Sequence, residues 1–269
     1  PLIISLGYTA EQIADLAPRV AKFADGLELS THYIGDDPQP MIDAIRAAKE
    51  AVQVPVFVKL SPFRDMKTAA QAAAEAGADG IAAINSYGPC LAIDIETGRP
   101  LMGSREGYGW MSGSLLKPLA VRCIFDVART VDLPIFGVGG VSRGEDAIEM
   151  FMAGASAVQV CTAAILRGPK IFGKIANQIE KWLDEHGYRS IDEIEGLAIK
   201  RLEEHTFRTT HVPPLLHIDK CTACRLCEIS CVYDAIKVTD DKAVLDESLC
   251  YGCGLCVTRC RPRALEMPY

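Results

Sequence analysis

Short apolar runs rich in valine and isoleucine alternate with longer amphipathic stretches before residue 205. The apolar runs lie at 2–6, 26–30, 54–60, 80–85, 134–139 and 157–161. Stretches with apolar residues at i, i+3 and i+4 lie at 10–23, 40–51, 66–76, 116–130, 144–153 and 172–186, and a further helix is expected at 191–204. The first pattern indicates buried strands and the second indicates helices with one apolar face. Their alternation predicts an α/β fold of repeated βα units on a parallel sheet.

The positions of the glycines favour a barrel over an open doubly wound sheet. A dinucleotide-binding sheet carries G-x-G-x-x-G after its first strand, and no such motif follows the first predicted strand here. Gly139 and Gly140 instead follow a late strand, and Cys161 and Thr162 end the next one. In a (β/α)8 TIM barrel, such late loops hold a phosphate with bare backbone N–H groups and a helix N-terminus. We expect a phosphate there, approaching Gly140 closely; plain tight turns are the alternative.

Composition narrows the class of protein. The chain has 269 residues, 49% of them hydrophobic and 23% charged, which fits a large folded domain with a smaller one. Its net charge of −7 disfavours nucleic acid as a partner. No apolar run reaches the ~18 residues of a membrane span and no secretion signal begins the sequence, so we expect a cytoplasmic protein without membrane attachment.

The cysteines are concentrated near the C-terminal end. Eight of the 11 lie between Cys221 and Cys260, in two copies of the spacing C-x2-C-x2-C-x3-C. The copies are Cys221, Cys224, Cys227 and Cys231, then Cys250, Cys253, Cys256 and Cys260. Structural zinc sites need two ligand pairs separated by a longer spacer, which neither copy has. The spacing therefore favours iron–sulfur clusters over zinc.

This duplicated spacing resembles bacterial two-cluster ferredoxins, in which the fourth cysteine of each motif crosses to the other cluster. The resemblance implies two [4Fe-4S] clusters, one on Cys221, Cys224, Cys227 and Cys260 and the other on Cys250, Cys253, Cys256 and Cys231. The proline that usually follows the fourth cysteine is replaced by Val232 and Arg261. We expect a barrel at 1–204, a linker at 205–216 and a small α+β ferredoxin-like domain at 217–269.

A second set of motifs resembles the barrel of the dihydroorotate dehydrogenase and dihydropyrimidine dehydrogenase family. The motifs are VKLSP at 58–62, INS at 84–86, SG at 112–113, KP at 117–118, GG at 139–140 and AGASAVQV at 153–160. The resemblance covers about residues 1–186 and implies bound FMN. It places Lys59, Ile84 and Gly113 near the flavin ring, and Gly139, Gly140, Cys161 and Thr162 around the phosphate. It also implies that Asn85 and Ser86 bind the substrate.

The sequence departs from that family in two places. Aligned on the family, residues 2–5 fall on the third barrel strand, so the first two βα units have no counterpart and we expect a fragment of a longer protein. In the family, the strand Leu-Glu-Leu leads to a loop with a cysteine or serine that handles the substrate proton. Here Leu27-Glu28-Leu29 leads to Ser30, Thr31, His32 and Tyr33, with no cysteine in the loop. His32 and Tyr33 are the candidate catalytic residues, with Cys90 a less favoured alternative and a structural role open for all three.

Two functions fit these observations. The first is an oxidoreductase that moves electrons between [4Fe-4S] clusters and FMN to reduce or oxidise a C–C or C=C bond of a small pyrimidine-like substrate. The second is an electron-transfer subunit with no substrate chemistry of its own. We favour the first because Asn85 and Ser86 resemble the family's substrate-binding pair. Expected partners are an electron-donor protein or an NAD(P)H-oxidising flavoprotein subunit, in an oligomer.

Overall fold

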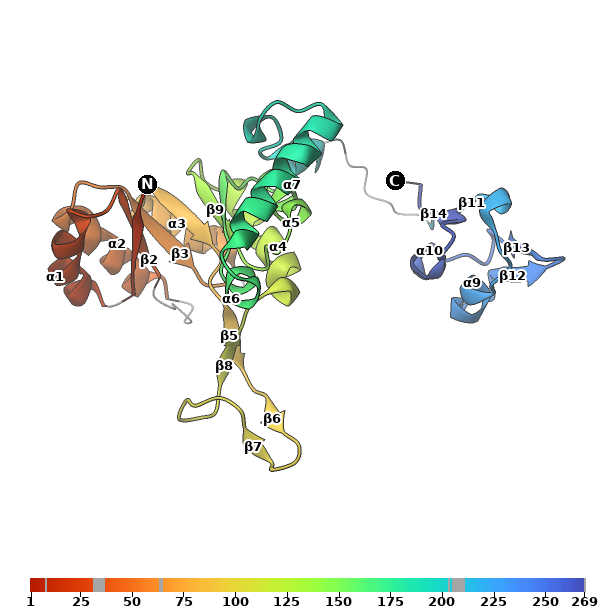
Figure 1. Cartoon of the computed structure of the whole chain (residues 1–269), viewed down its shortest axis with the longest axis horizontal. Coiled ribbons are helices and arrows are strands. Elements are labelled where there is room, and N and C mark those ends of the chain that lie inside the picture. The colour runs from red at the N-terminus through yellow and green to blue at the C-terminus, as the bar shows by residue number, and fades with distance from the viewer. Residues whose placement is uncertain (8, 31–36, 63–64, 203, 205–210, 269) are drawn as a thin grey trace. The chain divides into compact units, whose positions relative to one another are not determined.

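The chain folds as two compact units. The computed structural model describes residues 1–7, 9–30, 37–62, 65–202, 204 and 211–268. One unit spans Pro1–Glu204 and the other spans His205–Tyr269 (Figure 1). Within the described ranges, no helix is both long enough and apolar enough to cross a membrane.

The first unit is organised around a parallel sheet whose six strands are neighbours in chain order. They are β1 (Ile3–Leu6), β2 (Gly26–Leu29), β3 (Val56–Leu60), β4 (Gly80–Ala83), β9 (Ile135–Val138) and β10 (Ala157–Gln159). Every neighbouring pair is parallel. The six predicted strands are confirmed, each shorter at its ends by a residue or two.

Helices follow the strands, and the first five of them pack against the sheet. They are α1 (Ala10–Ala21), α2 (Gln39–Ala51), α3 (Met66–Glu75), α4 (Lys117–Ala128), α5 (Gly144–Met152), α6 (Thr162–Arg167) and α7 (Lys170–His186). The six helices predicted before residue 187 are confirmed, and the short α6 was not predicted. The helix expected at 191–204 is wrong as a single element: a turn at Ile191–Glu193 is separated from α8 (Leu197–Leu202) by Gly196, whose φ of +66° cannot continue a helix.

The sheet is strongly curled. Gln159 in β10 donates a hydrogen bond from Nε2 to Glu28 Oε2 in β2 over 2.5 Å. These two strands are four steps apart in the sheet, which in a flat sheet is about 19 Å at a spacing of ~4.8 Å. The rings of Phe57 and Phe136 also stack, with centroids 4.6 Å apart. The coarse prediction of a barrel-like parallel sheet is therefore confirmed as a curled, partial barrel; among the described residues, β10 does not pair back with β1.

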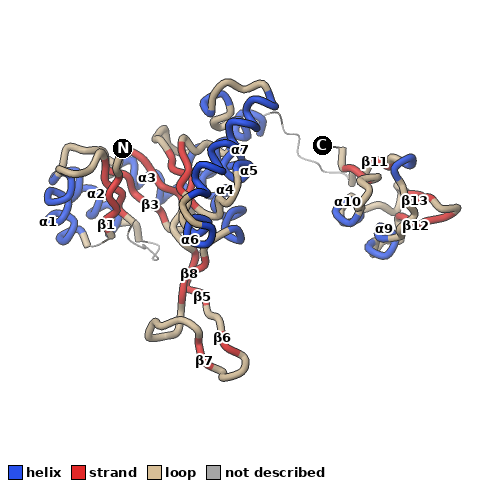
Figure 2. Tube along the Cα trace, viewed as in Figure 1, coloured by secondary structure: helices blue, strands red, loops and turns tan. Residues whose placement is uncertain are grey.

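A long arm projects from the first unit between β4 and α4 (Figures 1 and 2). It contains β5 (Tyr87–Cys90), β6 (Ile93–Asp94), β7 (Arg99–Pro100) and β8 (Gly109–Met111), with β5 paired to β8 and β6 to β7. Its exposed apolar side chains are Tyr87, Leu91, Ile93, Ile95, Leu101, Met102, Tyr108 and Trp110. None of these strands was predicted, because they are only two to four residues long and three of the four contain glycine or proline.

The second unit repeats one backbone pattern. Its elements are β11 (Leu215–Leu216), α9 (Leu226–Ser230), β12 (Ile236–Thr239), β13 (Lys242–Leu245), α10 (Leu255–Arg259) and β14 (Leu265–Glu266), with β11 paired to β14 and β12 to β13. Positive φ angles occur at Ala223, Arg225 and Asp234, and again at the equivalent positions Gly252, Gly254 and Arg263. The duplication seen in the cysteine spacing therefore extends to the backbone.

Candidate active site

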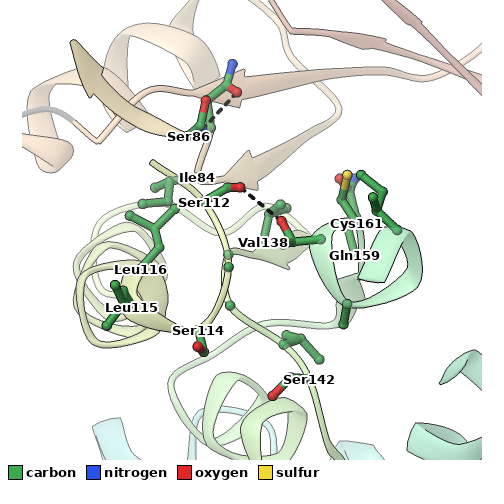
Figure 3. Close-up of a pocket in the computed structure, with 18 of the residues that line it drawn as sticks. Ile84, Ser86, Ser112, Ser114, Leu115, Leu116, Val138, Ser142, Gln159 and Cys161 are labelled. Atoms are coloured by element: carbon green, nitrogen blue, oxygen red, sulfur yellow. Dashed lines mark hydrogen bonds between the residues drawn. The ribbon is translucent and has the colours of Figure 1, made fainter. Parts of the chain in front are cut away.

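A cavity of about 570 Å³ opens at the carboxyl ends of β3, β4, β9 and β10 (Figure 3). This end of a curled parallel sheet is where barrel enzymes carry their sites. Nine residues that the sequence analysis singled out all line the cavity: Lys59, Ile84, Asn85, Ser86, Gly113, Gly139, Gly140, Cys161 and Thr162. Strand ends and loops far apart in sequence are thus brought to one place.

A buried charged cluster reaches the cavity through Lys59 and Gln159, which line it, with Glu28 in contact with both. Lys59 Nζ lies 2.6 Å from Glu28 Oε1 and donates a hydrogen bond to Gln159 Oε1 at 3.0 Å. Gln159 Nε2 completes the ring of contacts by donating to Glu28 Oε2. Glu28 is only 4% exposed, so it is a charge that requires a partner. The sequence analysis assigned no role to Glu28 or Gln159, although an acidic residue inside the apolar run LEL was a usable signal.

Hydroxyl groups and apolar side chains share the rest of the lining. Thr162 Oγ1 donates to Ser112 Oγ at 3.0 Å, and Ser114 and Ser142 also face the cavity (Figure 3). Ile84, Leu116 and Val138 supply apolar surface. The lining therefore combines apolar contacts for a flat ring with hydroxyl donors suited to an anion.

The two glycines of the turn after β9 have a packing role, as the alternative of plain tight turns expects. Gly139 and Gly140 have φ angles of +124° and +85°. A Cβ at Gly140 would lie 2.7 Å from Lys117 Cβ and 2.8 Å from Lys117 N. The missing side chain thus lets the turn pack against the start of α4. The expected approach of a phosphate to Gly140 stays a prediction. Among the described residues, the N–H groups of Gly139 and Gly140 make no hydrogen bond.

Asp146 holds the loop that follows this turn. Its Oδ2 accepts hydrogen bonds from Ser142 N at 3.0 Å, Ser142 Oγ at 2.9 Å and Arg143 N at 3.2 Å, and its Oδ1 lies 3.1 Å from Lys117 Nζ. Burial by itself raises the pKa of Asp146, but the bonds from Ser142 and Lys117 outweigh it and lower this pKa overall. The Glu149 carboxylate and, to a smaller extent, Asp146 raise the pKa of Lys117. Asp146 accepts hydrogen bonds from the backbone N–H groups of Ser142 and Arg143, which precede α5. These N–H groups therefore already have an acceptor within the protein.

Of the candidate substrate residues, Asn85 contacts Ser30, the residue that follows β2. Asn85 Nδ2 donates to Ser30 O at 3.3 Å, and Asn85 Oδ1 accepts from Ser86 N at 3.0 Å. These two bonds fix the orientation of the Asn85 amide. His32 and Tyr33 lie outside the described residues, so their candidate role as proton donors stays a prediction. Cys90 lies in the arm, where its Sγ is 3.6 Å from Tyr87 O, and it does not line the cavity.

The eight C-terminal cysteines divide between two small cavities of the second unit. Cys221, Cys224, Cys227 and Cys260 line one, and Cys231, Cys250, Cys253 and Cys256 line the other. Burial, then the neighbouring Cys250 and Cys253, raise the pKa of Cys256 to about 11. Among the described residues, no three His, Cys, Asp or Glu side chains are grouped as ligands of a single metal ion. The residues that line the two cavities show that each motif contributes three cysteines to one cavity and its fourth to the other.

Comparison with known proteins agrees with the architecture of the first unit. A family model described as dihydroorotate dehydrogenase matches residues 30–183. A protein of Methanothermobacter thermautotrophicus named dihydroorotate dehydrogenase B (NAD(+)), catalytic subunit, is 43% identical over 210 residues, which is 74% of this chain and 69% of that protein. Proteins of the same name from Thermococcus kodakarensis and Methanosarcina mazei are 41% and 46% identical over 211 residues, covering 74% of this chain and 69% and 66% of their own lengths. The match of residues 30–183 to this family model, and the identity of 43% to the Methanothermobacter protein over 69% of its length, show that the chain belongs to the dihydroorotate dehydrogenase family.

Proposed function

We propose that the first unit is an FMN-dependent dehydrogenase that acts on a CH–CH bond of a small pyrimidine-like compound, with dihydroorotate as the first candidate. The observation that carries this proposal is the single cavity in which all nine residues implied by the family resemblance meet. The names of the relatives supply the candidate substrate.

The cavity fits FMN in size and in the chemistry of its lining. Its volume of about 570 Å³ is within the ~300–1,000 Å³ usual for cofactor sites. Gly139 and Gly140 offer two N–H groups, Ser112 and Thr162 offer hydroxyls, and Arg167 lines the same cavity. These groups suit a phosphate, while Ile84 and Val138 suit a flat ring. Gly113, Cys161 and Lys59 complete the proposed cofactor set.

FMN, when bound, exchanges the hydride with the substrate carbon. The residues of the chain bind and orient the substrate and handle its proton. Asn85 and Ser86 are proposed to bind the polar edge of the substrate, since the Asn85 amide is held by Ser30 O and Ser86 N. His32 or Tyr33 is proposed to hold the proton, because both follow β2 in the loop after Ser30.

The second unit is proposed to carry electrons. Eight thiols in two groups of four match the donor set of two [4Fe-4S] clusters. The pKa of Cys256 is raised in the protein alone, and bound cationic iron would keep such a thiol in its thiolate form. A small-molecule substrate at one end of this route implies a second electron partner at the other. That partner is proposed to be an electron-donor protein or an NAD(P)H-oxidising flavoprotein subunit.

Anaerobic turnover of the whole chain tests the proposal. Protein purified without oxygen should release FMN on denaturation and should convert dihydroorotate to orotate with an artificial electron acceptor. The Asn85→Ala variant should lose turnover while retaining flavin. If flavin and clusters exchange electrons but no pyrimidine reacts, the electron-transfer subunit is the correct function; if no flavin is bound, the assignment of the cavity fails.

A further inference from the structure

Glu28, Lys59 and Gln159 form a closed set of contacts beside the cavity. The three side chains come from β2, β3 and β10, and every pair among them is in contact. Both carboxylate oxygens of Glu28 are used, and both polar atoms of the Gln159 amide are used. The amide can take only one of its two orientations, since its oxygen must face the Lys59 ammonium and its NH₂ must face Glu28.

These contacts hold the Lys59 ammonium at the cavity wall. Gln159 Oε1 accepts a hydrogen bond from Lys59 Nζ, and Glu28 Oε1 lies 2.6 Å from the same nitrogen in an ion pair. Lys59 itself lines the cavity. The position of its ammonium is therefore set by residues that do not themselves belong to the predicted cofactor set.

The cluster is electrically neutral as a whole. One carboxylate and one ammonium leave its net charge at zero, and both side chains are largely buried, with 6% and 15% exposure. In such surroundings their field is weakly screened, so the charge of Glu28 acts on the cavity together with that of Lys59. Removal of the carboxylate's charge would leave a net positive charge at the cavity wall.

We propose that Glu28 and Gln159 are positioning residues for Lys59, and that the Glu28 carboxylate holds the reduction potential of the bound flavin below the value that Lys59 alone would give. This inference rests on the proposed binding of FMN in the cavity. Reduced flavin carries more negative charge than oxidised flavin, so the uncompensated ammonium in a Glu28→Gln variant stabilises the reduced form more.

The midpoint potential of FMN in the full chain tests the proposal. We expect Glu28→Gln to tighten reduced FMN relative to oxidised FMN by about tenfold, a positive shift of about 30 mV for the two-electron couple. Lys59→Gln should shift the potential in the opposite direction. Asp79→Asn is the matched control, since it removes the carboxylate that lies 2.7 Å from Lys49 Nζ in the same unit, outside the cavity lining.

Each result has a definite meaning. An unchanged potential in Glu28→Gln, or an equal shift in Asp79→Asn, overturns the proposal. If Glu28→Gln does not fold, Glu28→Asp retains the charge but withdraws it by one methylene, and a smaller positive shift is expected; no shift there also overturns it. Failure of the parent chain to bind FMN would instead refute the proposed function.

Discussion

Asp146 should be essential for the stability of the first unit. It is 4% exposed and accepts three hydrogen bonds from Ser142 and Arg143, besides its ion pair with Lys117. Without the Asp146 carboxylate the loop donors of Ser142 and Arg143 lose their acceptor, while Lys117 keeps Glu149 Oε2 at 2.6 Å. An unsatisfied buried donor costs ~1–3 kcal/mol, which amounts to ~3–5 kcal/mol for the three together. Asp146→Ala should therefore destabilise the unit by about that amount. Asp146→Asn keeps one oxygen for the loop and should cost about 1–2 kcal/mol.

Urea unfolding followed by tryptophan fluorescence measures this cost in the whole chain. Both tryptophans, Trp110 and Trp182, lie within Pro1–Glu204, so the signal reports the first unit alone. Glu145→Gln is the control, since this exposed residue of the same helical turn should cost less than ~0.5 kcal/mol. Equal costs for Asp146→Ala and Glu145→Gln would refute the reasoning.

The same carboxylate gives a pH dependence. The pKa of Asp146 is lowered in the folded protein, so its contribution to stability is present above the unfolded value of ~3.9 and is lost as pH falls through the folded pKa. Asp146→Asn should accordingly lose less stability than the parent on acidification below about pH 4. An identical acid limb in the two proteins would contradict the lowered pKa.

Three further predictions follow from the turn, the cysteines and the loop after β2. Gly140→Ala should destabilise the first unit by ~2–3 kcal/mol in the same unfolding assay, because the new Cβ meets Lys117. Gly168 has a similar positive φ but no atom within 4 Å of a Cβ, so Gly168→Ala should cost only ~1 kcal/mol. Equal costs for the two variants would remove the steric explanation. Cys231→Ser should reduce iron from about eight to about four per chain and destroy the cluster of the second motif, as measured by iron analysis and electron paramagnetic resonance, whereas Cys90→Ser should leave the count unchanged. His32→Ala or Tyr33→Phe should slow turnover by ~10²–10⁴ with flavin reduction through the clusters preserved; parent rates in both variants would exclude them as the proton donor.

Every residue of β2 and β4 is buried, which makes these apolar runs nearly continuous and the strands predictable from the sequence. Ile81, Ala82 and Ala83, for example, are all fully buried in β4. The arm was missed because its strands pair only with each other and carry no periodic apolar pattern. Its exposed Ile95, at 89% exposure, gives no signal that distinguishes it from a buried residue.

The positions of the site residues followed from motifs, but their contacts did not. Lys59 and Gln159 are 100 residues apart in sequence, and only the curl of the sheet brings them together. Gly140 is a second example. The motif marked a position without a side chain, and only the structure shows that Lys117 fills the space that its Cβ would take. Sequence spacing alone does not tell which neighbour a glycine accommodates.

The exchange of fourth cysteines makes the two halves of the second unit mutually dependent. The cavity with Cys221 and Cys224 is closed by Cys260, Pro262 and Leu265, which belong to the later copy. The cavity with Cys250 and Cys253 is closed by Ser230, Cys231 and Tyr233 of the earlier one. Neither copy encloses a complete site by itself, so the unit cannot be divided into two independent minidomains. A peptide ending before Cys250 would hold an incomplete first site, and it should gain an ordered fold only when the other half is supplied in trans.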